Sequence, residues 1–141
     1  MLRPDAVEAL RGSNHIIHAG DVGDPEILDK LATIAPLTAI RGNIDKGAWA
    51  RKLPETEVVE IAGISIYVVH DLSRLDLKAE AAGFRVVISG HSHVPKQETR
   101  NGVLYFNPGS GGPRRFKLPI CVGKLTVEGK DVRAEIITIA D

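Results

Sequence analysis

The stretch Phe84-Arg85-Val86-Val87-Ile88-Ser89-Gly90-His91-Ser92-His93 decides how this chain is organised. Its apolar run predicts a short buried strand, and Gly90 allows a sharp turn where that strand ends. After the turn, His91 and His93 can face one cleft, because only one residue separates them. Two imidazoles in such a place indicate a metal site. Taken by itself, however, the motif is equally compatible with a pair of structural histidines.

Three other apolar runs end in the same way, each at a residue that can bind a metal. The runs over residues 15–19 and 38–40 lead into Gly20-Asp21 and Gly42-Asn43, and the run over 66–69 leads into His70. Sites in open α/β sheets lie outside the carboxyl ends of the strands. The sequence therefore predicts one rim that carries Asp21, Asn43, His70, His91 and His93.

The ligand types on this rim indicate a divalent metal. Carboxylate, amide oxygen and imidazole ligands suit manganese, iron, zinc or nickel. A structural zinc site would prefer several thiolates, and Cys121 is the only cysteine. Asp21 is the only carboxylate of the set and could bridge two metals. Two ions about 3.5–4 Å apart would stabilise both the attacking and the leaving oxygen of a phosphoester.

Each residue of the rim also has an ordinary structural interpretation. His70 could be a hydrogen-bonded structural histidine, Asp21 a helix cap and Asn43 a turn residue. Their recurrence at strand ends is what favours the metal site. His18 either orients Asp21 or is a buried structural histidine, and His15 is expected to be structural or exposed.

Two segments near the end of the chain could contact a substrate. Arg114–Lys117 is a basic cluster after a glycine-rich run, and it is either a solvated loop or a source of Arg114 for phosphate binding. Asn107–Ser110 is at least a turn and could present backbone amides to the cleft.

Composition describes an ordinary soluble domain. The 141 residues are enough for one domain, over residues 1–141, with 43% hydrophobic and 26% charged residues. The formal net charge is zero, which gives no electrostatic reason to expect nucleic acid or an anionic membrane as a partner. One cysteine excludes an intrachain disulfide, and no apolar run could span a bilayer. We expect a cytoplasmic protein.

The local patterns predict an α/β fold with a two-sheet core. Helices are predicted over residues 4–11, 24–34 and 72–82, with a helical turn within 45–53. Strands are predicted over 15–19, 37–40, 56–61, 64–69, 86–89, 97–100, 103–106, 120–127 and 132–139. The first strand–helix–strand unit implies parallel pairing. Ala62-Gly63 and Asn101-Gly102 mark hairpins, and residues 128–131 mark a third.

In order and spacing, the motifs Gly20-Asp21, Gly42-Asn43, Val69-His70-Asp71 and Gly90-His91-Ser92-His93 resemble the calcineurin-like metallophosphoesterases. The small YfcE-type phosphodiesterase branch is the most similar, and the resemblance covers nearly the whole chain. It implies a four-layer αββα sandwich with mixed sheets and a two-metal site, in which we expect manganese first and nickel, iron or zinc as alternatives.

The resemblance also implies roles for single residues. Asp21 would bridge the metals, Asn43, His70 and His91 would complete one shell, and His93 would join the other. These five residues are the predicted catalytic and metal-binding set, and Asn43 and Arg114 are the predicted substrate contacts.

The chain departs from the family pattern at its N-terminus. The family begins with a core strand that ends in Asp-x-His, and no Asp-x-His occurs in this sequence. We therefore expect the N-terminal core strand to be absent. A start assigned too late is the first explanation. A natural short form that binds one metal and a partner chain that fills the gap are the others, and a homo-oligomer is possible in the last case.

The predicted function is that of a metal-dependent phosphoesterase. A metal-activated hydroxide at a dinuclear site would hydrolyse a small phosphodiester substrate. One alternative is a non-catalytic protein-interaction scaffold on the same fold. Another is a metal-binding protein without turnover, whose stability would depend on metal.

Overall fold

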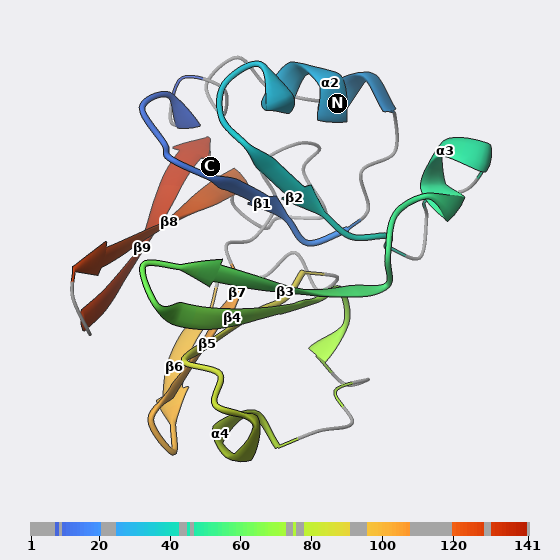
Figure 1. Ribbon diagram of the computed structural model, residues 1–141. Coiled ribbons are helices and arrows are strands. Elements are labelled where there is room, and N and C mark those ends of the chain that lie inside the picture. The colour runs from blue at the N-terminus through green and yellow to red at the C-terminus, as the bar shows by residue number, and fades with distance from the viewer. Residues whose placement is uncertain are drawn as a thin grey trace.

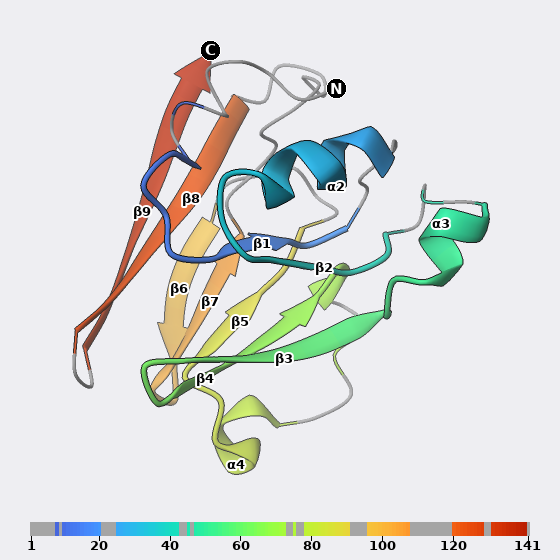
Figure 2. The ribbon, with the colours of Figure 1, turned by 45° about the horizontal axis from the view of Figure 1, so that its top comes forward.

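The structure is a computed structural model that describes residues 8, 10–20, 25–42, 45, 47–72, 75, 78–90, 96–107, 120–128 and 131–140. Five strands form the larger sheet, in the order β3-β4-β5-β7-β6 (Figures 1 and 2). Their bounds are β3 Thr56–Ile61, β4 Ile64–Val69, β5 Val86–Ile88, β6 Lys96–Arg100 and β7 Val103–Asn107. The central strands β4, β5 and β7 are parallel, and β3 and β6 pair antiparallel at the edges. The carboxyl ends of the central strands therefore meet at one edge.

Two smaller groups of strands accompany this sheet. β1 (Ile16–His18) and β2 (Leu37–Ala39) pair in parallel and are joined through α2 (Pro25–Ala32), which confirms the predicted strand–helix–strand unit. β8 (Ile120–Glu128) and β9 (Asp131–Ala140) form the predicted third hairpin. Within the described residues, β1 pairs only with β2 and β8 only with β9.

The main core lies between the five-stranded sheet and these two groups. Val59, Ile66, Val68 and Val86 are buried on the inner face of the sheet. Ile17 and Ala19 from the β1 segment pack against this cluster, and so do Leu125, Val127 and Val132 from the hairpin of β8 and β9. Both small groups therefore cover the same face of the large sheet.

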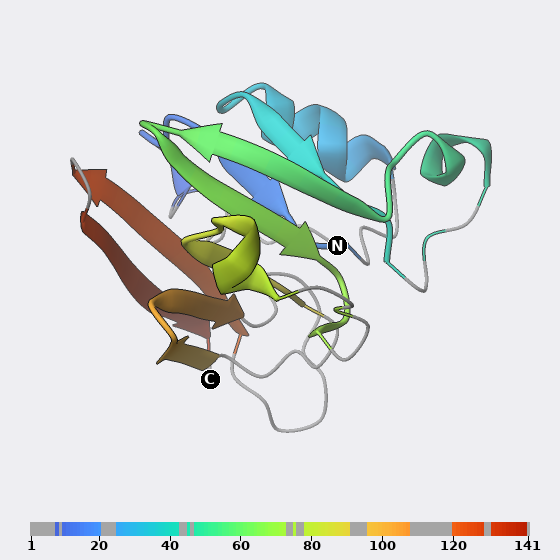
Figure 3. The same ribbon diagram turned by 60° about the horizontal axis from the view of Figure 1, so that its bottom comes forward.

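Helices cover the two outer faces. Leu31 of α2 and the nearby Ala35 are buried together with Ile16 of β1. On the opposite side, α4 (Ala79–Ala82) lies over the outer face of the large sheet, where Ala79 is buried with Val87 (Figure 3). The layers are thus helix, sheet, sheet and helix, and the predicted αββα architecture with a mixed sheet is confirmed.

The two hairpins predicted at Ala62-Gly63 and Asn101-Gly102 are present, and their turns share one geometry. Ala62 and Gly63 have φ angles of 52° and 82°, and Asn101 and Gly102 have φ angles of 51° and 78°. Positive φ at both central residues defines the type I′ turn, which matches the twist of the flanking strands. Asparagine tolerates this conformation, whereas alanine is strained in it by about 1–2 kcal/mol.

We therefore expect Ala62→Asn to raise the free energy of unfolding by about 0.5–1 kcal/mol, because part of that strain is removed. Urea unfolding followed by circular dichroism measures the change. Ala32→Asn is the matched control, since Ala32 is an exposed residue in α2. There the same substitution should be mildly destabilising. Equal effects at the two positions would contradict the turn argument.

The predicted helix over residues 72–82 was too long. The α-helix α4 covers only Ala79–Ala82, and the described residues Leu75 and Lys78 are not helical. The N–H of Leu75 donates a hydrogen bond of 3.1 Å to the carbonyl of Leu72. Leu72 packs against the outer-face cluster directly after β4. This contact forms without a long helix, so tertiary packing overrides the helical spacing.

The remaining helical segments agree with the sequence. α3 (Ala48–Arg51) is the turn of helix predicted within 45–53. α2 ends at Ala32, although its pattern runs on to Ile34, and Gly12 and Gly83 have positive φ where the predicted helices end. Among the described residues, no helix is long and apolar enough to cross a membrane.

Candidate metal centre

His70 lies where the ends of three strands meet. It follows β4 directly and is only 7% exposed. Its ring Nδ1 is 2.7 Å from the carbonyl oxygen of Ala19, which follows β1. The backbone carbonyl of His70 accepts a hydrogen bond of 2.9 Å from the N–H of Gly90, beyond the end of β5. One buried histidine therefore connects the ends of β4, β1 and β5.

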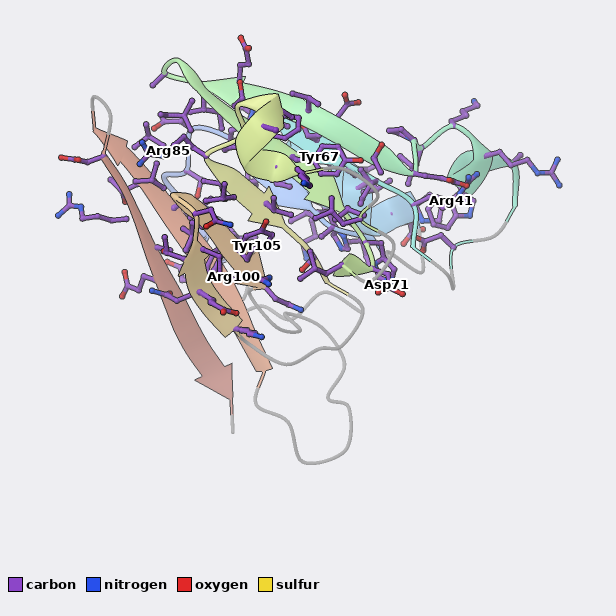
Figure 4. The ribbon with its side chains drawn as sticks, turned by 90° about the horizontal axis from the view of Figure 1, so that it is seen from below. Arg41, Tyr67, Asp71, Arg85, Arg100 and Tyr105 are labelled. Atoms are coloured by element: carbon purple, nitrogen blue, oxygen red, sulfur yellow. The ribbon has the colours of Figure 1, made fainter. Side chains whose placement is uncertain are left out.

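This convergence lies at the edge where the parallel strands end. Figure 4 shows Asp71, the residue after His70, at the opposite end of the parallel strands from Arg85, which precedes β5. Tyr67 and Tyr105, which Figure 4 also labels, belong to the separate cluster on the outer face. There Arg100 lies 4.3 Å above the ring of Tyr105, and the rings of Tyr67 and Phe84 are 5.1 Å apart.

The close approach of these strand ends depends on glycine. A Cβ atom at Gly20 would lie 2.6 Å from His70 Nδ1 and 2.9 Å from the backbone of Gly42. Gly20 also has a φ angle of 100°. A Cβ atom at Gly90 would lie 3.4 Å from Ala19 O and 3.6 Å from His70 Nδ1. Gly42 follows β2 after two residues, so the ends of β1, β2, β4 and β5 all meet here.

A short turn closes after β2. The buried carboxylate of Asp45 accepts a hydrogen bond of 2.8 Å from the N–H of Gly42, and the N–H of Asp45 donates to the carbonyl of Gly42 at 3.3 Å. Two hydrogen bonds therefore join Gly42 and Asp45. No motif in the sequence pointed to Asp45. An aspartate close to a glycine after a strand is the local turn signal that could have identified it.

The histidines of the first strand have local roles. The Nδ1 of His18 accepts a hydrogen bond of 3.2 Å from the N–H of Gly20, so this ring supports the turn after β1. His15 shares a hydrogen bond of 2.8 Å with the hydroxyl of Thr38 and is half-buried. The structural role expected for His15 is confirmed. That of His18 in orienting Asp21 stays a prediction.

Asn107 contributes a contact of a kind that the sequence did not predict. It is the last residue of β7 and is 8% exposed. Its side-chain Nδ2 donates a hydrogen bond of 3.0 Å to the carbonyl of Gly90. We expected the segment Asn107–Ser110 to present backbone amides. In the part of it that the structure describes, the side-chain amide makes the contact, and residues 108–110 lie outside the described ranges.

The predicted ligands divide into one that the structure describes and four that it does not. His70 is described. The remaining predicted ligands and the predicted phosphate contact lie outside the described residues: Asp21, Asn43, His91, His93 and Arg114. The described part of the chain accordingly holds no group of three or more His, Cys, Asp or Glu side chains that could bind a metal. The metal site therefore stays a prediction.

The structure nevertheless describes the residues that directly precede three of those predicted ligands. Gly20, Gly42 and Gly90 directly precede Asp21, Asn43 and His91 in the sequence. A Cβ atom added at Gly20 would lie 2.6 Å from His70 Nδ1, and one added at Gly90 would lie 3.6 Å from it. The Cβ atom added at Gly20 would also lie 2.9 Å from the backbone of Gly42. The chain thus enters all three predicted ligands from one small region around His70.

The surroundings of His70 fit a divalent metal. A metal-binding histidine commonly donates its second ring N–H to a backbone carbonyl, which fixes the orientation of the ring. The bond from His70 Nδ1 to Ala19 O has this form, so coordination would use Nε2. Imidazole together with carboxylate and amide oxygen suits manganese, iron, nickel or zinc.

Comparison with known proteins identifies the family. The model of the calcineurin-like phosphoesterase superfamily domain matches residues 1–130. A probable metallophosphoesterase of Methanocaldococcus jannaschii is 39% identical over 134 residues, which cover 89% of this chain and 67% of the relative. The protein belongs to the calcineurin-like phosphoesterase superfamily.

Solved structures show the same fold at low sequence identity. An archaeal phosphodiesterase superposes with a TM-score of 0.76 at 24% identity, over 95% of this chain and 92% of that one. Wild-type Vps29 of Entamoeba histolytica, complexed with Zn²⁺, superposes with a TM-score of 0.77 at 19% identity, over 99% and 91% of the two chains. The family resemblance predicted from the strand-end motifs is thereby confirmed.

Proposed function

We propose that the protein is a metal-dependent phosphodiesterase whose metal centre forms around His70. The predicted ligands are Asp21, Asn43, His70, His91 and His93. One observation carries the proposal: His70 is buried with its Nδ1 held by the Ala19 carbonyl, at the point from which the chain enters Asp21, Asn43 and His91. Family membership supports hydrolysis of a phosphoester.

The protein groups have separate tasks in this proposal. The hydrogen bond to Ala19 holds the imidazole of His70 in one orientation for a ligand, so that little rearrangement is needed on binding. Asn43 and Arg114 would contact the substrate phosphate, Arg114 through its planar guanidinium. When bound, divalent metal supplies Lewis-acid stabilisation of phosphoryl oxygens and lowers the pKa of water.

A phosphodiester is the proposed substrate class, and manganese the proposed metal. The archaeal phosphodiesterase with the same fold supports the first choice. The zinc complex of the Entamoeba protein makes zinc the main competitor for the second. Both choices can be tested with small aryl phosphates.

We expect the purified protein to hydrolyse bis(p-nitrophenyl) phosphate faster than p-nitrophenyl phosphate, and to do so only with a divalent metal. Release of nitrophenolate is measured after removal of metal and reloading with Mn²⁺, Ni²⁺, Zn²⁺ or Mg²⁺. Elemental analysis of the manganese-loaded protein should give about two ions per chain if the site is dinuclear. Absence of hydrolysis with every metal would refute the proposal that the protein is an enzyme. Faster hydrolysis of p-nitrophenyl phosphate than of bis(p-nitrophenyl) phosphate would refute the proposed substrate class.

A non-catalytic scaffold is the second candidate function. The fold is shared with Vps29 structures, and Val58 on the edge strand β3 is a large hydrophobic side chain that is 48% exposed. A scaffold predicts a folded protein without hydrolysis, whose exposed apolar residues contact a partner. The aryl phosphate assay separates the two candidates directly.

A further inference from the structure

We infer that Asn107 is a positioning residue for the metal centre, acting through Gly90 on His70 and on the chain that enters His91. This inference rests on the proposed function. Its starting point is the pairing of β5 with β7, which is parallel and ends with Ile88 opposite Phe106. One more backbone bond, from the N–H of Ser89 to the carbonyl of Phe106 at 3.1 Å, extends the ladder beyond β5.

At the next position a side chain replaces the backbone. The Nδ2 of Asn107 donates to the carbonyl of Gly90 at 3.0 Å. On the other side, the N–H of Gly90 donates to the carbonyl of His70 at 2.9 Å. Both polar backbone groups of Gly90 are therefore engaged, one with the strand end on each side.

These bonds continue into the candidate centre. His70, which receives the Gly90 N–H at its carbonyl, engages the Ala19 carbonyl through Nδ1 at 2.7 Å. A series of hydrogen bonds thus runs from the end of β7 through the ends of β5 and β4 to the end of β1. Asn107 and His70 are 8% and 7% exposed, so water cannot easily replace a bond that is lost.

The Gly90 carbonyl belongs to the peptide group that joins Gly90 to the predicted ligand His91. Its carbon forms the peptide bond to His91, and the atoms of a peptide group lie in one plane. A donor that fixes the carbonyl oxygen therefore fixes the plane from which the chain continues into His91. Asn107 exerts this effect without contacting a metal or substrate.

The positioning role of Asn107 requires a hydrogen-bond donor at Nδ2, and this requirement can be tested by substitution. Asn107→Asp keeps the size of the side chain but replaces the Nδ2 donor by a carboxylate oxygen opposite the Gly90 carbonyl. Asn107→Ala removes the donor without adding charge. Asn101→Asp is the matched control, because Asn101 lies at the exposed opposite end of the same hairpin and aspartate also tolerates its positive φ.

The affinity for Mn²⁺ is measured by titration calorimetry on the metal-free proteins, and their folding by urea unfolding without metal. We expect both Asn107 variants to bind Mn²⁺ about 10- to 100-fold more weakly than the wild type, the range for lost partners of metal ligands. Asn101→Asp should bind like the wild type. The loss should persist under conditions where unfolding shows the Asn107 variants to be folded.

The possible outcomes separate this inference from the proposed function. Wild-type affinity in the folded Asn107 variants, or an equal loss in Asn101→Asp, would overturn the positioning role and leave the metal centre intact. Lower stability with unchanged affinity would also overturn it, since Asn107 would then be merely structural. A wild-type protein that binds no Mn²⁺ would overturn both proposals.

Discussion

Gly20→Ala should abolish Mn²⁺ binding and lower the free energy of unfolding by about 2–5 kcal/mol. The new Cβ atom would lie 2.6 Å from His70 Nδ1 and 2.9 Å from the Gly42 backbone, and neither the buried ring nor the backbone can move away cheaply. Overpacking of this kind costs about 1–3 kcal/mol. The φ angle of 100° adds about 1–2 kcal/mol of strain for any residue with a side chain.

Gly83→Ala separates these two contributions. Gly83 has a φ angle of 85°, and a Cβ atom there would meet nothing within 4 Å. This variant should lose only about 1–2 kcal/mol and should bind Mn²⁺ normally. Urea unfolding and calorimetry measure both quantities. Equal losses of stability in the two variants would show that the contacts around Gly20 are looser than the structure indicates.

His70→Ala should reduce Mn²⁺-dependent diester hydrolysis to the background rate. The substitution removes one proposed ligand, and removal even of a ligand's hydrogen-bond partner costs about 10- to 100-fold in affinity. We therefore expect affinity for Mn²⁺ to fall by at least about 100-fold. The buried Ala19 carbonyl also loses its partner, which should cost about 1–3 kcal/mol of stability.

His15→Ala is the control for this variant. Like His70, His15 is hydrogen-bonded, to the hydroxyl of Thr38 at 2.8 Å, but it is only half-buried, precedes β1 and lies away from the carboxyl ends of the strands. Its loss should lower stability and leave Mn²⁺ affinity and hydrolysis unchanged. Activity that survives in His70→Ala, or disappears equally in His15→Ala, would contradict the assignment of His70.

The sequence predicted most of the fold because local signals agree with the tertiary structure. Asn101-Gly102 and Ala62-Gly63 predicted hairpins, and the structure has a tight turn at both. The apolar run before Ser89 predicted a short buried strand, and all three residues of β5 are buried. Where a local preference met a competing long-range contact, as for Leu72 before α4, the prediction of a long helix was wrong.

The candidate site was predicted less completely than the fold. Strand-end motifs identified His70 and the glycines, because ligands and turns leave short patterns in the sequence. The role of Asn107 depends instead on a hydrogen bond to a backbone atom far away in the sequence. The bond from Asn107 to Gly90 spans 17 residues, and the bond from His70 to Ala19 spans 51. No local pattern of residue types encodes such a partner.

The long span between His70 and Ala19 has a consequence for folding. Contacts between residues far apart in sequence form late and slowly, because the closure of a long loop costs entropy before any contact offsets it. A rim built from the ends of β1, β4, β5 and β7 is therefore complete only when nearly the whole chain has folded. A ligand of this rim would bind the native state and no partly folded form. At a concentration 100 times its dissociation constant, such a ligand would add about 2.7 kcal/mol to the free energy of unfolding.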